Sequence, residues 1–148
     1  ILMADRLGFS LTLATPEPEI RAASFDPRLQ AITQHSEKIN HVDDPRIAID
    51  GADFIYTDTW IDMQFFNDPE KKAEKAALLT KMQPFQVNES LIEGHDLMIM
   101  HDMPIHNDYE ITPGLVRDPR SIIFNQAANR LQAQKGLLYW LLNAQTSL

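Results

Sequence analysis

The sequence predicts an α/β domain in which an open, mostly parallel sheet carries helices on both faces. Three short apolar segments rich in strand-forming residues, at 9–14, 53–60 and 97–100, alternate with segments that carry helix start and stop signals. No two-residue hairpin signal joins these segments, so successive strands are expected to run parallel with helices between them. Too few strand–helix units are present to close a barrel.

Capping residues, prolines and glycines mark the elements of the first half. Residues 1–7 favour a helix that stops at Gly8, a residue suited to the position after a helix end. Nothing before Ile1 can cap this helix, so we expect the first strand and the start of the first helix to be missing and the chain to be truncated at its N-terminus. The other elements expected here are the strand at 9–14, a helix over 26–37 behind Asp26-Pro27, a strand at 38–42, and a short helix over 44–49 ended by Gly51.

The second half begins with a predicted strand whose side chains are apolar on both faces. Phe54, Ile55 and Tyr56 are consecutive apolar residues, as expected when helices cover both faces of a sheet. The elements expected after this strand are helices over 70–82 and 87–93, a strand at 97–100, a helical turn at 112–114, a strand at 121–124 and a helix over 126–143.

Composition excludes several classes of protein. The 148 residues suit one domain, and a net charge of -8 with 13 scattered basic residues argues against a nucleic-acid partner. The absence of Cys excludes disulfides and thiolate chemistry and fits a cytoplasmic protein. Every apolar run falls short of the roughly 20 residues that a membrane span needs.

Ligands of open parallel sheets bind beyond the carboxyl ends of the strands, which directs attention to residues 15–17, 58–62 and 101–106. His95, His101 and His106 alternate with acidic residues there, but their spacing matches no metal-binding pattern, so we expect no metal. Arg130 is expected near the start of the last helix, where a cation is unfavourable unless an anion is bound nearby. The alternative is that Arg130 is a surface residue.

Several segments in order resemble the aspartate/ornithine carbamoyltransferase family, in its acceptor-binding, C-terminal domain and its ornithine-type branch. The most specific is 101–104, His-Asp-Met-Pro, where the family has His-Cys-Leu-Pro. The run 126–130, Gln-Ala-Ala-Asn-Arg, is similar to the family's Gln-Ala-Glu-Asn-Arg. Residues 57–64 keep the family's Thr-Asp-x-Trp and Met but have Asp62 and Gln64 where the family has Ser and Gly. Segments 7–16 and 85–88 also fall in family order.

The resemblance implies a Rossmann-like fold, with 1–148 forming the acceptor-binding domain and the carbamoyl-phosphate domain absent from this chain. It implies transfer of a carbamoyl group from carbamoyl phosphate to a small amine or amino acid, without metal or organic cofactor. Family members are trimers, so a homo-oligomer, most simply a trimer, is expected, and the fragment alone should be inactive.

The same resemblance assigns roles to single residues. Asp58 would hold the acceptor's α-amino group, and Arg130 would contact the carbamoyl group of the donor. The turn formed by Met103 and Pro104 would present main-chain carbonyls to the carbamoyl NH2. The full set is Asp102, His101 and Arg130 as catalytic residues and Asp58, Asp62, Met63, Met103, Pro104 and Gln126 as substrate-binding residues.

Alternatives remain open at this level. Asp102 could receive the amine proton, anchor a more cationic acceptor, or simply pair with an Arg. Asp58 could merely cap its loop, and His101 is expected to orient a neighbouring carbonyl. A rival for the whole chain is a non-catalytic paralogue with a binding or regulatory role. A weaker rival is a nucleotide-binding α/β domain, disfavoured because no Gly-x-Gly-x-x-Gly motif is present.

Overall fold

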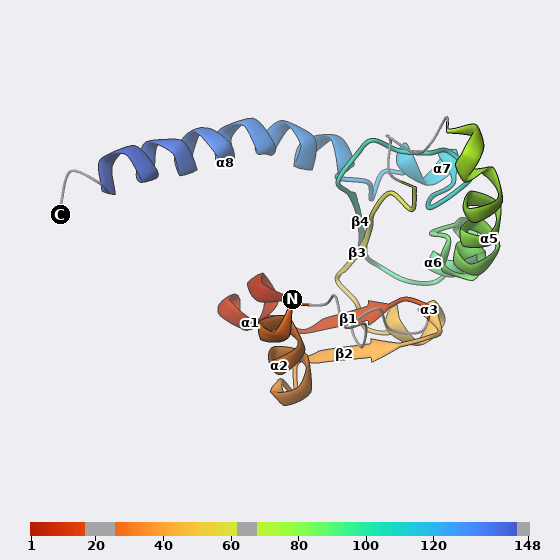
Figure 1. The fold of residues 1–148 in the computed structure, drawn as a ribbon, viewed down its shortest axis with the longest axis horizontal. Helices are drawn as coiled ribbons and strands as arrows, with labels where there is room; N and C mark the ends of the chain where they lie inside the picture. The colour runs from red at the N-terminus through yellow and green to blue at the C-terminus, as the bar shows by residue number, and fades with distance from the viewer. Residues whose placement is uncertain (17–25, 62–67, 145–148) are drawn as a thin grey trace.

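Two pairs of short parallel strands organise the protein. The computed structural model describes residues 1–16, 26–61 and 68–144 (Figure 1). Strand β1 (Leu11–Ala14) pairs in parallel with β2 (Ile39–Val42), and β3 (Phe54–Thr57) pairs in parallel with β4 (Met98–His101). The predicted α/β class is therefore confirmed. No strand of the described ranges joins the two pairs, which form separate two-stranded sheets where one sheet was expected.

The helices follow the predicted boundaries closely. They are α1 (Leu2–Leu7), α2 (Pro27–His35), α3 (Pro45–Ala48), α5 (Lys72–Met82), α6 (Glu89–Ile92), α7 (Pro113–Val116) and α8 (Ile123–Ala144), with 3-10 turns η2 (Pro69–Lys71) and η3 (Gln83–Phe85) on either side of α5. Gly8 ends α1 in the left-handed conformation, with φ 76°, which is the backbone state that glycine was expected to supply.

The prediction of a strand at 121–124 was wrong. Ser121 forms only a single bridge with Ile99 of β4, and α8 begins at Ile123, three residues before the expected start. A short apolar run carries no period that separates strand from helix. Here Ile123 lies in the first turn of α8 with its side chain completely buried in the core, and this burial favours the helix.

The tripeptide Asp-Pro-Arg occurs three times, at 26–28, 44–46 and 118–120, and forms the same local structure each time. In each case an Asp oxygen accepts the main-chain N–H of the Arg two residues later, at 2.8 or 2.9 Å, and the guanidinium bonds the same carboxylate. The first two copies start α2 and α3, with proline at the first helical position. The motif is thus a self-contained turn that fixes the backbone before an element begins.

The core lies beside β4 rather than beneath both sheets. Its fully buried members are Ile92, Ile99, Ile111, Leu115 and Ile123, contributed by α6, β4, α7, α8 and the loop before α7. Because Ile99 sits in the middle of β4, this cluster holds the strand that leads directly to His101. The packing therefore makes the end of β4 a rigid platform.

Large apolar surfaces remain exposed elsewhere. Phe54 and Tyr56 of β3 are more than half exposed, although helices were expected on both faces of this strand. Helix α8 extends away from the body of the chain (Figure 1), and its outer part exposes Leu137, Leu138 and Trp140. No helix in the ranges that the structure describes is long and apolar enough to cross a membrane.

Candidate functional site

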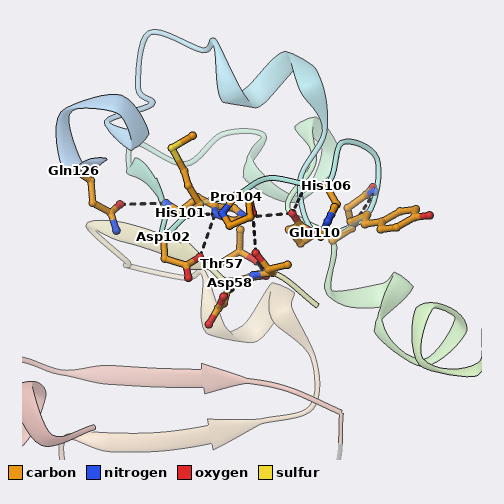
Figure 2. Close-up of polar contacts among 12 residues, drawn as sticks. Thr57, Asp58, His101, Asp102, Pro104, His106, Glu110 and Gln126 are labelled. Atoms are coloured by element: carbon orange, nitrogen blue, oxygen red, sulfur yellow. Dashed lines mark hydrogen bonds and ion pairs between the residues drawn. The ribbon is translucent and has the colours of Figure 1, made fainter. Parts of the chain in front are cut away.

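The register of β3 and β4 brings two aspartates together at the ends of the strands. Thr57 is paired with His101, so the residues that follow, Asp58 and Asp102, leave neighbouring parallel strands at the same level. Figure 2 shows both carboxylates at this edge. Two of the three strand-end segments singled out from the sequence, 58–62 and 101–106, thus begin side by side at this edge.

His101 is buried and bonded on both sides of its ring. Its Nδ1 accepts a hydrogen bond from the main-chain N–H of Met103 at 2.8 Å, and its Nε2 lies 3.2 Å from Oε1 of Glu110. Because Nδ1 acts as an acceptor, the ring proton must be on Nε2, where it is donated to the carboxylate. We expected His101 to orient a carbonyl. The structure corrects this, since the group it orients is the Met103 amide.

Glu110 is a site residue that the sequence reading missed. It lies in the loop before α7, is completely buried, and accepts a second hydrogen bond from the main-chain N–H of His106 at 2.5 Å (Figure 2). Burial raises the pKa of Glu110, but the hydrogen bonds from His101 and His106 outweigh it and leave the pKa below its ordinary value. Glu110 therefore stays ionised and fixes the tautomer of His101.

The Met103-Pro104 turn is held from two directions. Met103 has a left-handed backbone, with φ 60°, and is joined to Pro104 by a cis peptide bond. The hydroxyl of Thr59 donates to the carbonyl oxygen of Pro104 at 2.7 Å, which ties the loop after β3 to the turn after β4. Together with the His101 contact, this hydrogen bond fixes the direction in which the turn's main-chain groups point.

The side chain of Asp102 has a shifted pKa. Burial and the neighbouring Asp58 carboxylate together raise the pKa of Asp102 above its ordinary value. Asp102 makes no contact with an Arg in the described ranges, so the simple structural pairing considered above finds no support there. Asp58 also accepts the N–H of Thr59 at 2.6 Å, so the loop-capping role and the position at the site edge coexist.

Helix α8 contributes Gln126, whose side-chain oxygen accepts the main-chain N–H of His101 at 3.2 Å (Figure 2). Arg130 lies one turn further along the same side of the helix and is exposed. The argument from an Arg at a helix start does not hold, because α8 begins at Ile123 and the dipole acts only within the first turn. Arg130 therefore lies one helical turn beyond Gln126, the residue of α8 that bonds the end of β4.

Two predicted site residues, Asp62 and Met63, lie outside the described residues. In the described ranges no three His, Asp or Glu side chains gather into a group that could hold a metal ion. His106 lies on a loop, as expected, and its ring is 6.0 Å from that of Tyr109.

Comparison with known proteins shows which family the chain is similar to. The family model "Aspartate/ornithine carbamoyltransferase, Asp/Orn binding domain" matches residues 1–141. An ornithine carbamoyltransferase of Picrophilus torridus is 34% identical over 152 aligned positions, which cover 97% of this chain and 46% of that protein. The chain thus spans less than half the length of this curated relative.

Solved structures give the same result. The ornithine carbamoyltransferase of Pyrococcus furiosus superposes with a TM-score of 0.70 at 32% identity, covering 90% of this chain and 42% of that one. An N-acetyl-L-ornithine transcarbamylase, solved with carbamyl phosphate and N-succinyl-L-norvaline, gives 0.69 at 25% identity, covering 92% and 41%. With the family model matching nearly the whole chain, this protein belongs to the aspartate/ornithine carbamoyltransferase family.

Proposed function

We propose that the protein containing this chain transfers the carbamoyl group of carbamoyl phosphate to the amine of a small amino acid or diamine, with ornithine-like acceptors preferred. In this proposal the chain supplies the acceptor half of the active site. The observation that carries it is the edge formed by Asp58, Asp102 and the His101 turn, in a chain whose match is to an Asp/Orn binding domain. An acidic edge suits a ligand that carries an ammonium group.

The chemistry requires positioned hydrogen bonds rather than a cofactor. The neutral amine attacks the carbamoyl carbon, a C–N bond forms, the C–O bond to phosphate breaks, and the amine proton leaves with the phosphate. Main-chain groups of the turn at Met103 and Pro104 would hold the carbamoyl group, because His101 and Thr59 fix their directions. Holding two reactants in a reactive geometry can lower a reaction barrier by up to about 7 to 11 kcal/mol.

Individual roles follow from position. Asp58 would bind the acceptor ammonium, Gln126 would anchor the end of β4, and Arg130 would contact the anionic donor from α8. We assign Asp62 and Met63 to the acceptor on the family motif alone. A relative solved with carbamyl phosphate and N-succinyl-L-norvaline supports a site that takes a phosphorylated donor beside an amino-acid-like ligand.

We also propose that the domain works with an N-terminal carbamoyl-phosphate domain, in a cytoplasmic homotrimer. The exposed apolar side chains of α8 and of β3 support a covering partner, since contiguous apolar patches on soluble proteins mark interaction surfaces. Light scattering after size exclusion of the full-length protein would test the trimer directly.

The proposed activity is tested by incubating the full-length protein with carbamoyl phosphate and a panel of amines, and measuring ureido product and phosphate together. We expect stoichiometric formation of both, with Asp58→Asn raising KM for the acceptor by about 10- to 100-fold, as for loss of a charge-assisted hydrogen bond. Asp53→Asn, at the opposite end of β3, is the matched control and should behave as the parent. No ureido product from any amine would contradict the proposal and favour the non-catalytic relative.

A further inference from the structure

Two hydrogen-bond acceptors face each other between His101 and Asp102 (Figure 2). Oδ1 of Asp102 lies 3.2 Å from Nδ1 of His101, and the single lone pair of that nitrogen already accepts the main-chain N–H of Met103 at 2.8 Å. Asp102 Oδ1 is buried, and no donor reaches it from the described part of the chain. A buried carboxylate oxygen beside a nitrogen without a proton is an unfavourable contact, so another group must keep the ring in this state.

A second arrangement of the imidazole would satisfy Asp102. If the ring proton moved from Nε2 to Nδ1, His101 could donate it to Asp102 Oδ1, because the two atoms are already within hydrogen-bond range. A nitrogen that carries a proton cannot accept, so the N–H of Met103 would lose its acceptor. The carboxylate of Asp102 and the turn that begins at Met103 therefore compete for the same ring nitrogen.

Glu110 decides between the two tautomers from the opposite ring nitrogen. Its Oε1 lies 3.2 Å from Nε2 of His101, and an ionised carboxylate only accepts hydrogen bonds, so this contact requires a proton on Nε2. Both side chains are completely buried, where a mismatch between two acceptors is most unfavourable. Loss of the Glu110 carboxylate would therefore remove the group that holds the proton on Nε2.

The loop that carries Glu110 is held by contacts that do not involve His101. The carbonyl oxygen of Glu110 accepts the main-chain N–H of Val87 at 2.9 Å. The side-chain amide of Gln86 donates to two further carbonyls of the same loop, at 2.9 and 3.0 Å. Because the segment before α6 fixes this loop, the carboxylate is in place before the ring chooses a tautomer, and it imposes that tautomer on the ring.

We propose that Glu110 is a positioning residue that holds the proton of His101 on Nε2 against competition from Asp102, and thereby keeps the Met103 amide in the orientation that carbamoyl transfer needs. The inference rests on the proposed carbamoyl transfer and deepens it, because it names a buried residue on which the turn depends. The competition comes from the Asp of this chain, since Cys, the residue of the similar family motif at this position, has only a weakly accepting sulfur.

The test is nitrogen-15 NMR of the full-length protein with labelled histidine, because a ring nitrogen that carries a proton differs strongly in chemical shift from one that does not. We expect the proton of His101 on Nε2 in the parent and largely on Nδ1 in Glu110→Met, which removes the acceptor at similar side-chain length. Glu110→Gln keeps an acceptor oxygen and should keep the parent's tautomer. In Glu110→Met combined with Asp102→Ala the competing acceptor is gone, so the proton should return to Nε2.

Turnover measured on the same proteins gives the functional readout. Glu110→Met should lower kcat about 10- to 100-fold, as for misplacement of a group that holds a reactant, while KM for the acceptor changes less than about threefold. Glu110→Gln should recover most of the parent's kcat. Glu89→Met is the matched control, because it makes the same substitution at an exposed carboxylate that accepts the hydroxyl of Thr112 at 3.0 Å, and it should behave as the parent.

Three results overturn the inference: a proton on Nδ1 in the parent, a proton that stays on Nε2 in Glu110→Met, or a changed tautomer in Glu110→Met with the parent's kcat. If Glu110→Met does not fold, Glu110→Asp withdraws the carboxylate by one methylene and should give both tautomers and an intermediate kcat. The parent's single tautomer in that variant overturns the inference equally. Absence of ureido product in the parent overturns the proposed function instead, while NMR still reports the tautomer of His101 directly.

Discussion

The side chains of Glu110 and His101 are both fully buried, and Oε1 of Glu110 is 3.2 Å from Nε2 of the imidazole. The opposite ring nitrogen of His101 bonds the amide of Met103. A buried carboxylate is therefore connected through one ring to the turn that faces the strand-end edge. Glu110 acts as a positioning residue, because its link to the Met103-Pro104 turn passes through the ring of His101.

Replacing Glu110 with Ala should destabilise the protein by about 2 to 4 kcal/mol, because two buried donors lose their acceptor and a cavity is left. Urea unfolding measures this loss. Glu110→Gln keeps the shape and one acceptor oxygen, so it should cost markedly less. Equal unfolding midpoints for the Ala variant and the parent would show that the His101 tautomer is set in another way.

Asp118→Asn should lower the melting temperature at neutral pH, with a difference that disappears in acid. The Arg120 guanidinium and amide lower the pKa of Asp118 from 3.8 to about 2. A lowered folded-state pKa contributes stability that is present above pH 3.8 and is lost as the pH falls through 2. Melting curves of Asp118→Asn and of the parent, recorded between neutral pH and about pH 2, measure this difference.

The control for Asp118 is the matching substitution in another copy of the Asp-Pro-Arg motif. Asp26 makes the same contacts with Arg28, but that Arg side chain is 83% exposed, against 35% for Arg120. Arg120 also donates to the carbonyl of His95 at 3.0 Å. Asp26→Asn should therefore change the melting temperature less than Asp118→Asn, and the reverse order would contradict the ranking by burial.

Asp102→Asn should stabilise the fold at neutral pH. The pKa of Asp102 is raised in the folded state, so its contribution to stability is present below pH 3.8 and is lost as the pH rises through the folded value. Ionised Asp102 thus opposes folding at pH 7, and an amide that donates to Asp58 removes this cost. Thermal melting at pH 7 and at about pH 3 should give a gain only at the higher pH. A loss at pH 7 would contradict the sign.

Arg130→Ala should weaken binding of carbamoyl phosphate to the full-length protein by about 2 to 4 kcal/mol, as for loss of a charge-assisted contact to a buried anion. Lys135→Ala, which removes a cation further along α8, serves as the control and should leave the affinity near the parent's. Calorimetry with the donor alone makes the measurement. Unchanged affinity in Arg130→Ala would remove this residue from the site.

Residues 1–148 expressed alone should self-associate and form no ureido product. Leu137, Leu138, Leu141 and Leu142 are all exposed on α8, and Phe54 is exposed on β3. Such a surface favours association in water. Light scattering should give a mass that rises with concentration, and Leu138→Glu should reduce the association. A monodisperse monomer that turns over substrate would contradict both parts of the expectation.

The sequence by itself determined the local structure and the edge at which function was sought. Asp-Pro pairs fix a cap and a backbone angle within three residues, and Gly8 supplies a left-handed turn, so these boundaries need no distant contact. The rule that ligands bind beyond parallel strand ends then directed attention to three segments, two of which contain Asp58 and Asp102, without coordinates. A family motif added the Met103-Pro104 turn.

Only the tertiary structure decided the rest. Glu110 follows His101 by nine residues in a loop with no hydrophobic period, so no sequence signal indicates that its carboxylate bonds the imidazole. Ile123 joined α8 because burial against the core outweighed the ambiguous preference of a short apolar run. The proximity of Asp58 and Asp102 depends on the pairing of Thr57 with His101, and a shift of one residue would separate the two carboxylates, because side chains alternate along a strand.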